Sequence, residues 1–124
     1  MKRSERRGAP RVSCRLPITL TEQSEDLVTQ TKNISASGAY CTLRRFVVPM
    51  TKLQIRLKVP SRPQPTWVTC EGVVVRVEPP RQIPRRRSYH VAIFFTELAE
   101  SDRAIVARYV QQRLRTGSPV AVNR

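Results

Sequence analysis

The chain has 124 residues, enough for one domain with a single core, and its hydrophobic content of 40% is that of an ordinary globular protein. The charge is not ordinary, because 23 lysine and arginine residues against 9 acidic ones give a formal net charge of +14. Such a charge predicts an anionic partner, namely nucleic acid, a nucleotide or an acidic membrane surface, without choosing among them. No apolar run has the length of a signal peptide or a membrane span, so we expect a cytoplasmic protein without membrane insertion.

The first notable segment is Glu-Arg-Arg-Gly-Ala-Pro-Arg at positions 5–11. Pro10 lacks a backbone N–H and biases the residue before it towards an extended conformation, so a stable helix is not expected here. The guanidiniums of Arg6, Arg7 and Arg11 can each fork onto a phosphate or lie flat on a base. We therefore predict a flexible ligand-binding arm over residues 1–11; the alternative is a solvated basic tail.

Alternating apolar and polar residues predict six strands. The first covers residues 12–20, with Pro17 on its outer face at an edge or bulged position. A polar turn at 21–26 separates it from a second, threonine-rich strand at 27–34. The other four strands are predicted over residues 39–45, 53–59, 66–77 and 89–95, and Gly72 indicates a bulge or a close backbone approach in the fifth.

Only the end of the chain has a helical pattern. Ser101 can cap a helix in which Asp102 complements the dipole, and Gly117 and Pro119 can end it. Its apolar stripe consists of Ile105, Val106, Tyr109, Val110 and Leu114. Together these elements predict an all-β fold with one C-terminal helix, a six-stranded antiparallel β-barrel flanked by an α-helix over residues 12–116, followed by a tail over 117–124.

Catalysis is not the expected activity. The single histidine, His90, lies in a strand pattern, and the two aspartates, Asp26 and Asp102, are far apart in sequence. Cys14, Cys41 and Cys70 lack metal-ligand spacing and fall in apolar strand patterns, so buried reduced thiols are expected. Because the chain also has no Gly-rich phosphate loop, we predict a binding protein with no metal and no cofactor.

The second notable segment is Asn-Ile-Ser-Ala-Ser-Gly at positions 33–38. Residues of these types commonly form turns, because their side chains bond the nearby backbone and glycine accepts positive φ. However, Asn33 and Ser35 stand two positions apart at a strand end, so their side chains are expected on one face. There an amide and a hydroxyl can bind the polar edge of a base, and Gly38 allows a ligand to approach the backbone closely.

The two segments together resemble the RxxxR and (D/N)xSxxG motifs of PilZ domains, a family of bacterial receptors for the second messenger cyclic di-GMP. RGAPR at 7–11 matches the first motif and NISASG at 33–38 the second, in the family's order and separated by a strand pair. Glu5 and Arg6 ahead of the first motif, and Phe-Thr-Glu-Leu at 95–98, are also typical of the family. Asn33 replaces the commoner aspartate and Ser37 a frequent glycine. The resemblance covers nearly the whole chain and implies the same six-stranded barrel with a C-terminal helix.

The resemblance also implies the ligand site. Arg7 and Arg11 would contact phosphate and the N7 and O6 acceptors of guanine, Asn33 and Ser35 would hold a guanine edge, and Gly38 would allow close approach. Arg6 resembles the arginine of family members that bind cyclic di-GMP as an intercalated dimer. The arm would close over the barrel when the ligand binds and relay the signal to a downstream protein partner that the sequence does not identify.

Two other functions are compatible with the sequence. A basic small barrel can bind nucleic acid, although DNA binding is not expected because an aromatic stacking platform is missing, and Trp67 fits strand packing better. A PilZ-type domain can also act as a protein-interaction domain without ligand. The arginine-rich loop at 81–87 can belong to a partner surface, attract an anionic ligand, or be a solvated charged loop.

Overall fold

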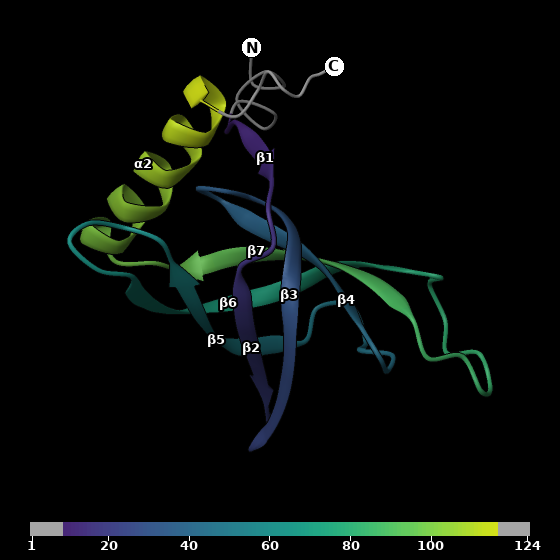
Figure 1. Ribbon diagram of the computed structural model, residues 1–124. Helices are drawn as coiled ribbons and strands as arrows, with labels where there is room; N and C mark the ends of the chain where they lie inside the picture. The colour runs from purple at the N-terminus through teal and green to yellow at the C-terminus, as the bar shows by residue number, and fades with distance from the viewer. Residues whose placement is uncertain (1–8, 117–124) are drawn as a thin grey trace, which may run out of the picture.

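The fold is an antiparallel β-barrel with one helix at its end (Figure 1). The computed structural model describes residues 9–116. Its elements are β1 (Arg11–Ser13), β2 (Pro17–Glu22), β3 (Glu25–Ser35), β4 (Gly38–Leu43), β5 (Lys52–Val59), β6 (Thr66–Glu78), β7 (Tyr89–Glu97) and α2 (Glu100–Thr116). The predicted fold class, a six-stranded antiparallel barrel with one C-terminal helix, is confirmed.

The barrel closes because β3 pairs with strands on both sides. The strand order is β1-β3-β2-β5-β6-β7-β4, and an additional pairing of β3 with β4 completes the ring. The first half of β3 pairs with β2, from Glu25 opposite Glu22 to Gln30 opposite Pro17. Its second half pairs with β4 on one edge and with β1 on the other. β3 therefore belongs to both walls of the barrel.

The prediction of one continuous strand over 12–20 is wrong, because the chain is interrupted between β1 and β2. The buried hydroxyl of Thr31 lies in this gap, where it accepts a hydrogen bond from the Leu16 N–H at 2.9 Å and donates one to the Cys14 carbonyl at 2.9 Å. The pairing of β3 with β4 shifts register at the same level, between Thr31 and Asn33. A strict alternation cannot reveal such an irregularity, because the side chains of Cys14 and Leu16 still point inward.

The turn between β2 and β3 is also tighter than predicted. The strands extend to Glu22 and from Glu25, so that only Gln23 and Ser24 form the connection. Both have positive φ, 51° and 73°, as expected for a two-residue hairpin turn that follows the twist of the strands.

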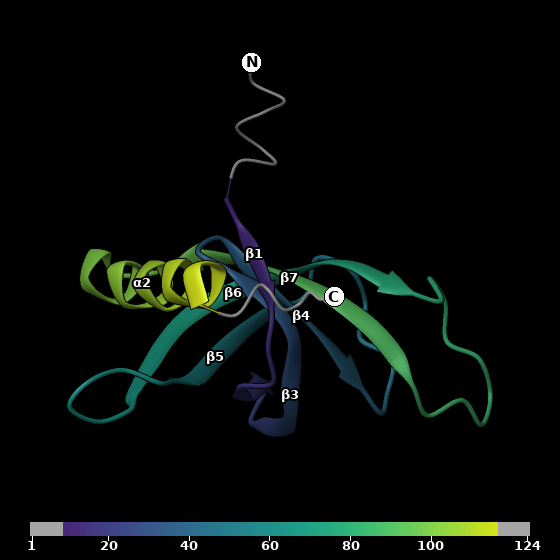
Figure 2. The same cartoon turned by 45° about the horizontal axis from the view of Figure 1, so that its top comes forward.

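Helix α2 packs its apolar side against one end of the barrel, beside β1 (Figure 2). Val106, Tyr109 and Val110 are buried in the common core, whereas Leu114 is 40% exposed at the end of the predicted stripe. The predicted cap at Ser101 is wrong: the helix already begins at Glu100, and the Arg103 N–H bonds to the Ala99 carbonyl at 2.8 Å. The apolar spacing therefore located the helix correctly, but Ser101 is the second residue of the helix and not its cap.

The barrel interior contains the three thiols but not the tryptophan. Cys14, Cys41 and Cys70 are buried and free, as predicted, and burial raises the pKa of Cys41 to about 12. Trp67 was expected to fit strand packing, and it lies in β6, where it is 47% exposed on the outer surface of the sheet. His90 is a half-buried strand residue, as predicted; its Nδ1 lies 3.2 Å from the Thr42 hydroxyl and its ring stacks on Tyr40.

Two glycines are required by the close approach of neighbouring strands. A Cβ on Gly38 would collide with the Ile93 carbonyl of β7. A Cβ on Gly72 would lie 2.5 Å from Cδ1 of Ile55 and 3.0 Å from the Phe94 carbonyl, at a register shift between β6 and β7 that confirms the predicted bulge. Neither described glycine has positive φ. Glycine is therefore needed at Gly38 because a side chain has no room there, and not because of the backbone conformation.

We expect Gly38→Ala to destabilise the protein more than Gly72→Ala does. At Gly38 the new methyl group meets a backbone carbonyl that cannot move without separating β4 from β7, whereas at Gly72 its nearest neighbour is the flexible end of Ile55. Overpacking of a core typically costs about 1–3 kcal/mol. Urea denaturation of both variants measures the difference, and equal free energies of unfolding would contradict the explanation.

Candidate functional site

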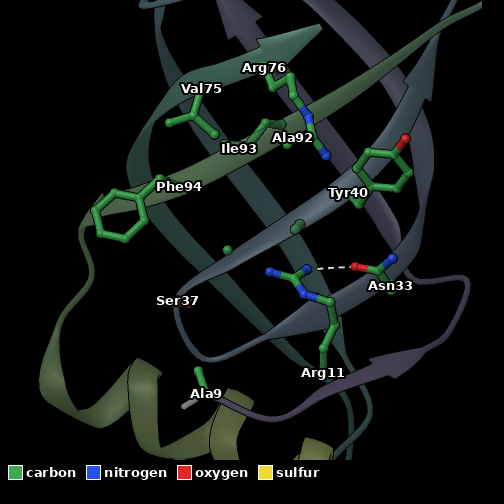
Figure 3. Close-up of a pocket in the computed structure, with 12 residues that line it drawn as sticks. Ala9, Arg11, Asn33, Ser37, Tyr40, Val75, Arg76, Ala92, Ile93 and Phe94 are labelled. Atoms are coloured by element: carbon green, nitrogen blue, oxygen red, sulfur yellow. Dashed lines mark hydrogen bonds between the residues drawn. The ribbon is translucent and has the colours of Figure 1, made fainter. Parts of the chain in front are cut away.

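A pocket of about 730 Å³ lies between the two predicted motifs and the outer surface of β6 and β7 (Figure 3). Ala9, Arg11, Asn33, Ser37 and Gly38 line its motif side. A volume of this size is typical of small-molecule sites. Arg11 of the first motif and Asn33 of the second, which stand 22 positions apart in the chain, therefore line one common cavity.

Arg11 joins the two motifs directly. Arg11 stands opposite Ser35 in the antiparallel pairing of β1 with β3. The guanidinium donates one hydrogen bond to Oδ1 of Asn33 at 2.6 Å (Figure 3). It donates another to the hydroxyl of Ser35 at 3.5 Å. The prediction that Asn33 and Ser35 share a face is confirmed by this common partner.

The Ser35 side chain is buried and also shapes the turn between β3 and β4. Its hydroxyl accepts a hydrogen bond from the Ser37 N–H at 3.1 Å and lies 3.1 Å from the Ser37 hydroxyl. The turn-forming interpretation of this segment is thus confirmed, and the same hydroxyl that fixes the turn also contacts Arg11. Gly38 follows directly and lines the pocket, although its packing against Ile93 already explains why it is glycine.

The far side of the pocket was not predicted from sequence; it is lined by residues of β6 and β7, namely Val75, Arg76, Ala92, Ile93 and Phe94. Tyr40 of β4, which also lines the pocket, was not predicted either. Val75 and Phe94 are 52% and 48% exposed, which is high for apolar side chains. The exposure of both side chains could have been predicted from the sequence. Successive side chains of a strand point to opposite faces, so the run of valines at 73–75 must direct some of them outward. For the same reason Phe94 points away from the face of its buried neighbours Ile93 and Phe95. Alternation alone could not show that these outward residues face the motifs.

The described lining of the pocket carries two cations, Arg11 and Arg76, and no carboxylate. Partial burial lowers the pKa of Arg11, but a guanidinium stays protonated at physiological pH. Arg76 also lies 3.6 Å from a carboxylate oxygen of Glu78, a pair that is largely exposed and weak. The pocket is therefore suited to an anionic ligand that has flat apolar surface.

Two of the predicted site residues, Arg6 and Arg7, lie outside the described residues. Within residues 9–116, His, Cys, Asp and Glu side chains do not gather into a possible metal site. In the same part of the chain, the only helix is too short or too polar to span a membrane. The loop with Arg81, Arg85, Arg86 and Arg87 is exposed and projects from the barrel on the side away from α2 (Figure 1).

Comparison with solved structures supports the fold. The chain is similar to the Bacillus subtilis inhibitor of motility, MotI/DgrA, with a TM-score of 0.74 and 20% sequence identity over 89% of this chain and 52% of that one. It thus spans about half the length of that protein. It is also similar to the PilZ domain of CeSA from a cellulose-synthesizing bacterium, with a TM-score of 0.51 and 12% identity over 82% and 95% of the two chains. No curated protein sequence matches significantly.

The family is shown by sequence. A family model described as PilZ domain matches residues 5–112, which include both motifs, all strands and most of α2. The chain therefore belongs to the PilZ domain family.

Proposed function

We propose that the chain is a receptor for cyclic di-GMP that binds the dinucleotide in the pocket between β1, β3 and β7. PilZ domains are in general receptors of this kind. The observation that carries the proposal is the Arg11 guanidinium, which is held by Asn33 and Ser35 at the edge of a cationic pocket. Arg6 and Arg7 would complete the site from the N-terminal arm.

The positive charge of the pocket fits the two negatively charged phosphodiester groups of a cyclic dinucleotide. Arg11 uses two of its five N–H donors on Asn33 and Ser35, so further donors remain for a phosphate oxygen or for N7 and O6 of guanine. Its attachment to β3 also limits the side-chain entropy that binding has to remove. Arg76, on the opposite side, supplies a second cation for the two phosphates.

Asn33 would contact the ligand mainly as a donor. Its carbonyl oxygen already accepts the 2.6 Å hydrogen bond from Arg11, so the amide N–H groups are left for the ligand. An aspartate at this position would instead offer a second carboxylate oxygen to N1–H and N2–H of guanine. The exposed surfaces of Val75 and Phe94 would cover the apolar face of a base.

The output of the receptor would pass to a separate protein. Closure of the arm over the pocket would bring Arg7 onto the ligand beside Arg11, which β1 already holds there, and would change the surface around β1. Neither a nucleic-acid partner nor a ligand-free interaction domain gives a comparable reason for joining the two motifs through Arg11. In the titration below, binding of oligonucleotides instead of the dinucleotide would favour the first of these, and binding of neither would favour the second.

Replacing Arg11 with alanine should weaken cyclic di-GMP binding by roughly 10–100-fold, because a hydrogen bond to a charged group contributes about 1.5–3 kcal/mol. The same loss is expected for Arg7→Ala. Isothermal titration calorimetry measures both, with Arg81→Ala as a control that removes the same charge outside the pocket. If the dinucleotide does not bind while mixed-sequence oligonucleotides bind with strong salt dependence, the protein is a nucleic-acid binder instead.

Asn33→Asp should strengthen cyclic di-GMP binding by several-fold, because a carboxylate can accept from Arg11 and from guanine at once, and charge-assisted hydrogen bonds are about twice as strong as neutral ones. Asn33→Ala should weaken binding, since Arg11 then loses its shortest partner. Calorimetry on the two variants side by side checks the order. Weaker binding by the aspartate variant would show that the ligand needs the amide donor.

The stoichiometry of binding should depend on Arg6. If its guanidinium stacks on the second molecule of an intercalated dimer, the unaltered chain binds two ligands and Arg6→Ala binds one. Calorimetric stoichiometry, checked by native mass spectrometry, distinguishes the two. One ligand per unaltered chain would contradict the stacked dimer without affecting the proposed site.

A further inference from the structure

The outer surface of β2, β3, β5 and β6 carries a second cluster of unusual exposed residues. Trp67 is 47% exposed, with the guanidinium of Arg56 at 4.7 Å from its ring centroid and the ammonium of Lys58 at 5.8 Å. Lys58 stands directly opposite Trp67 in the pairing of β5 with β6. Arginine stacked on tryptophan is a common composition of protein-binding hot spots.

This cluster continues across the sheet. Arg56 lies between Thr69 of β6 and Thr19 of β2, and Thr19 lies opposite Val28 of β3. Val28 is the most exposed large apolar side chain in the described part of the chain, at 77%. We call the surface formed by Val28, Thr19, Arg56, Thr69, Lys58 and Trp67 the Trp67 face.

Acidic residues are confined to one border of the Trp67 face. The next row across the sheet contains Asp26 and Glu71, which accept hydrogen bonds from Thr21 at 2.7 Å and from Gln54 at 3.2 Å. Within residues 9–116, neither Arg56 nor Lys58 takes part in a salt bridge. Their two charges are therefore available to a partner.

We propose that the Trp67 face docks an acidic segment of another protein, with carboxylates on Arg56 and Lys58 and apolar side chains on Trp67 and Val28. This proposal rests on the proposed function in one respect: the docked protein would be the partner that receives the signal. The Trp67 face contains no residue of the ligand pocket. β3 contributes to both surfaces, with Val28 in its first half and Asn33 and Ser35 in its second.

Two other occupants fit the Trp67 face less well. A nucleic-acid strand would find a single aromatic ring on this face, whereas surfaces that bind single strands stack successive bases on several. A second copy of the chain would have to associate against a formal net charge of +14 on each molecule. An acidic protein segment complements both the local cations and the overall charge.

The chain contains one tryptophan, so its fluorescence reports on this face alone. The test titrates a fluorescein-labelled peptide of alternating glutamate and leucine into the ligand-free protein, following peptide anisotropy and Trp67 emission together. We expect saturable binding and a change in Trp67 emission. The double variant R56A/K58A should weaken binding by about tenfold or more, and W67A should weaken it to a similar extent.

The matched control is R81A/R87A, which removes the same charge from the projecting loop and should change affinity by less than about threefold. Equal losses in both double variants would mean general charge attraction and would overturn the proposal. Tighter binding of oligothymidylate with quenching of Trp67, or a dimer in sedimentation that R56A/K58A dissociates, would overturn it in favour of the other occupants. Circular dichroism of each variant confirms that the fold is retained. Dinucleotide binding is measured separately, so either proposal can fail alone.

Discussion

The fold depends on the bend of β3 between Thr31 and Asn33. At this point the strand leaves β2 and begins to pair with β1 and β4, which allows one chain segment to serve both walls of the barrel. The Thr31 hydroxyl bonds both Leu16 N–H and the Cys14 carbonyl in the interior, where regular pairing is interrupted. An unsatisfied buried backbone group costs about 1–3 kcal/mol, so a threonine at this position stabilises an irregularity that an apolar residue would leave without hydrogen bonds.

The candidate site is a direct consequence of that bend. After the register shift, Asn33 and Ser35 face the short strand β1, where Arg11 stands opposite Ser35. The polar side chains on β3 thus meet the arginine without a long loop, which suits precise recognition of a small ligand. The floor of the pocket is equally constrained, because Gly38 lies against the Ile93 carbonyl and brings β7, with Phe94, beside the motif.

Much of this arrangement was predictable from sequence, for identifiable reasons. The strands β5, β6 and β7 follow strict alternation or long β-branched runs, so their existence was predicted correctly. The meeting of Arg11 with Asn33 and Ser35 followed from the motif pair. The interruption at Cys14–Leu16 was missed because inward side chains continue through it. The contacts of Trp67 with Arg56 and Lys58 were not predicted, because these two partners come from another strand. The start of α2 was missed because a serine near a helix is only a weak signal of its cap.

Helix α2 is hydrogen-bonded to both segments that form the motif side of the pocket. Arg113 donates to the Ser13 carbonyl of β1 at 2.6 Å, and Arg103 donates to the Ala36 carbonyl in the turn after Ser35 at 3.2 Å. The buried Val106 and Val110 fix the helix between these two contacts. The position of Arg11 against Ser35 is therefore set by the core of the whole domain and not by the two motifs alone. The pocket and the Trp67 face are joined by two strands, β3 with Asn33 and Val28 and β6 with Arg76 and Trp67.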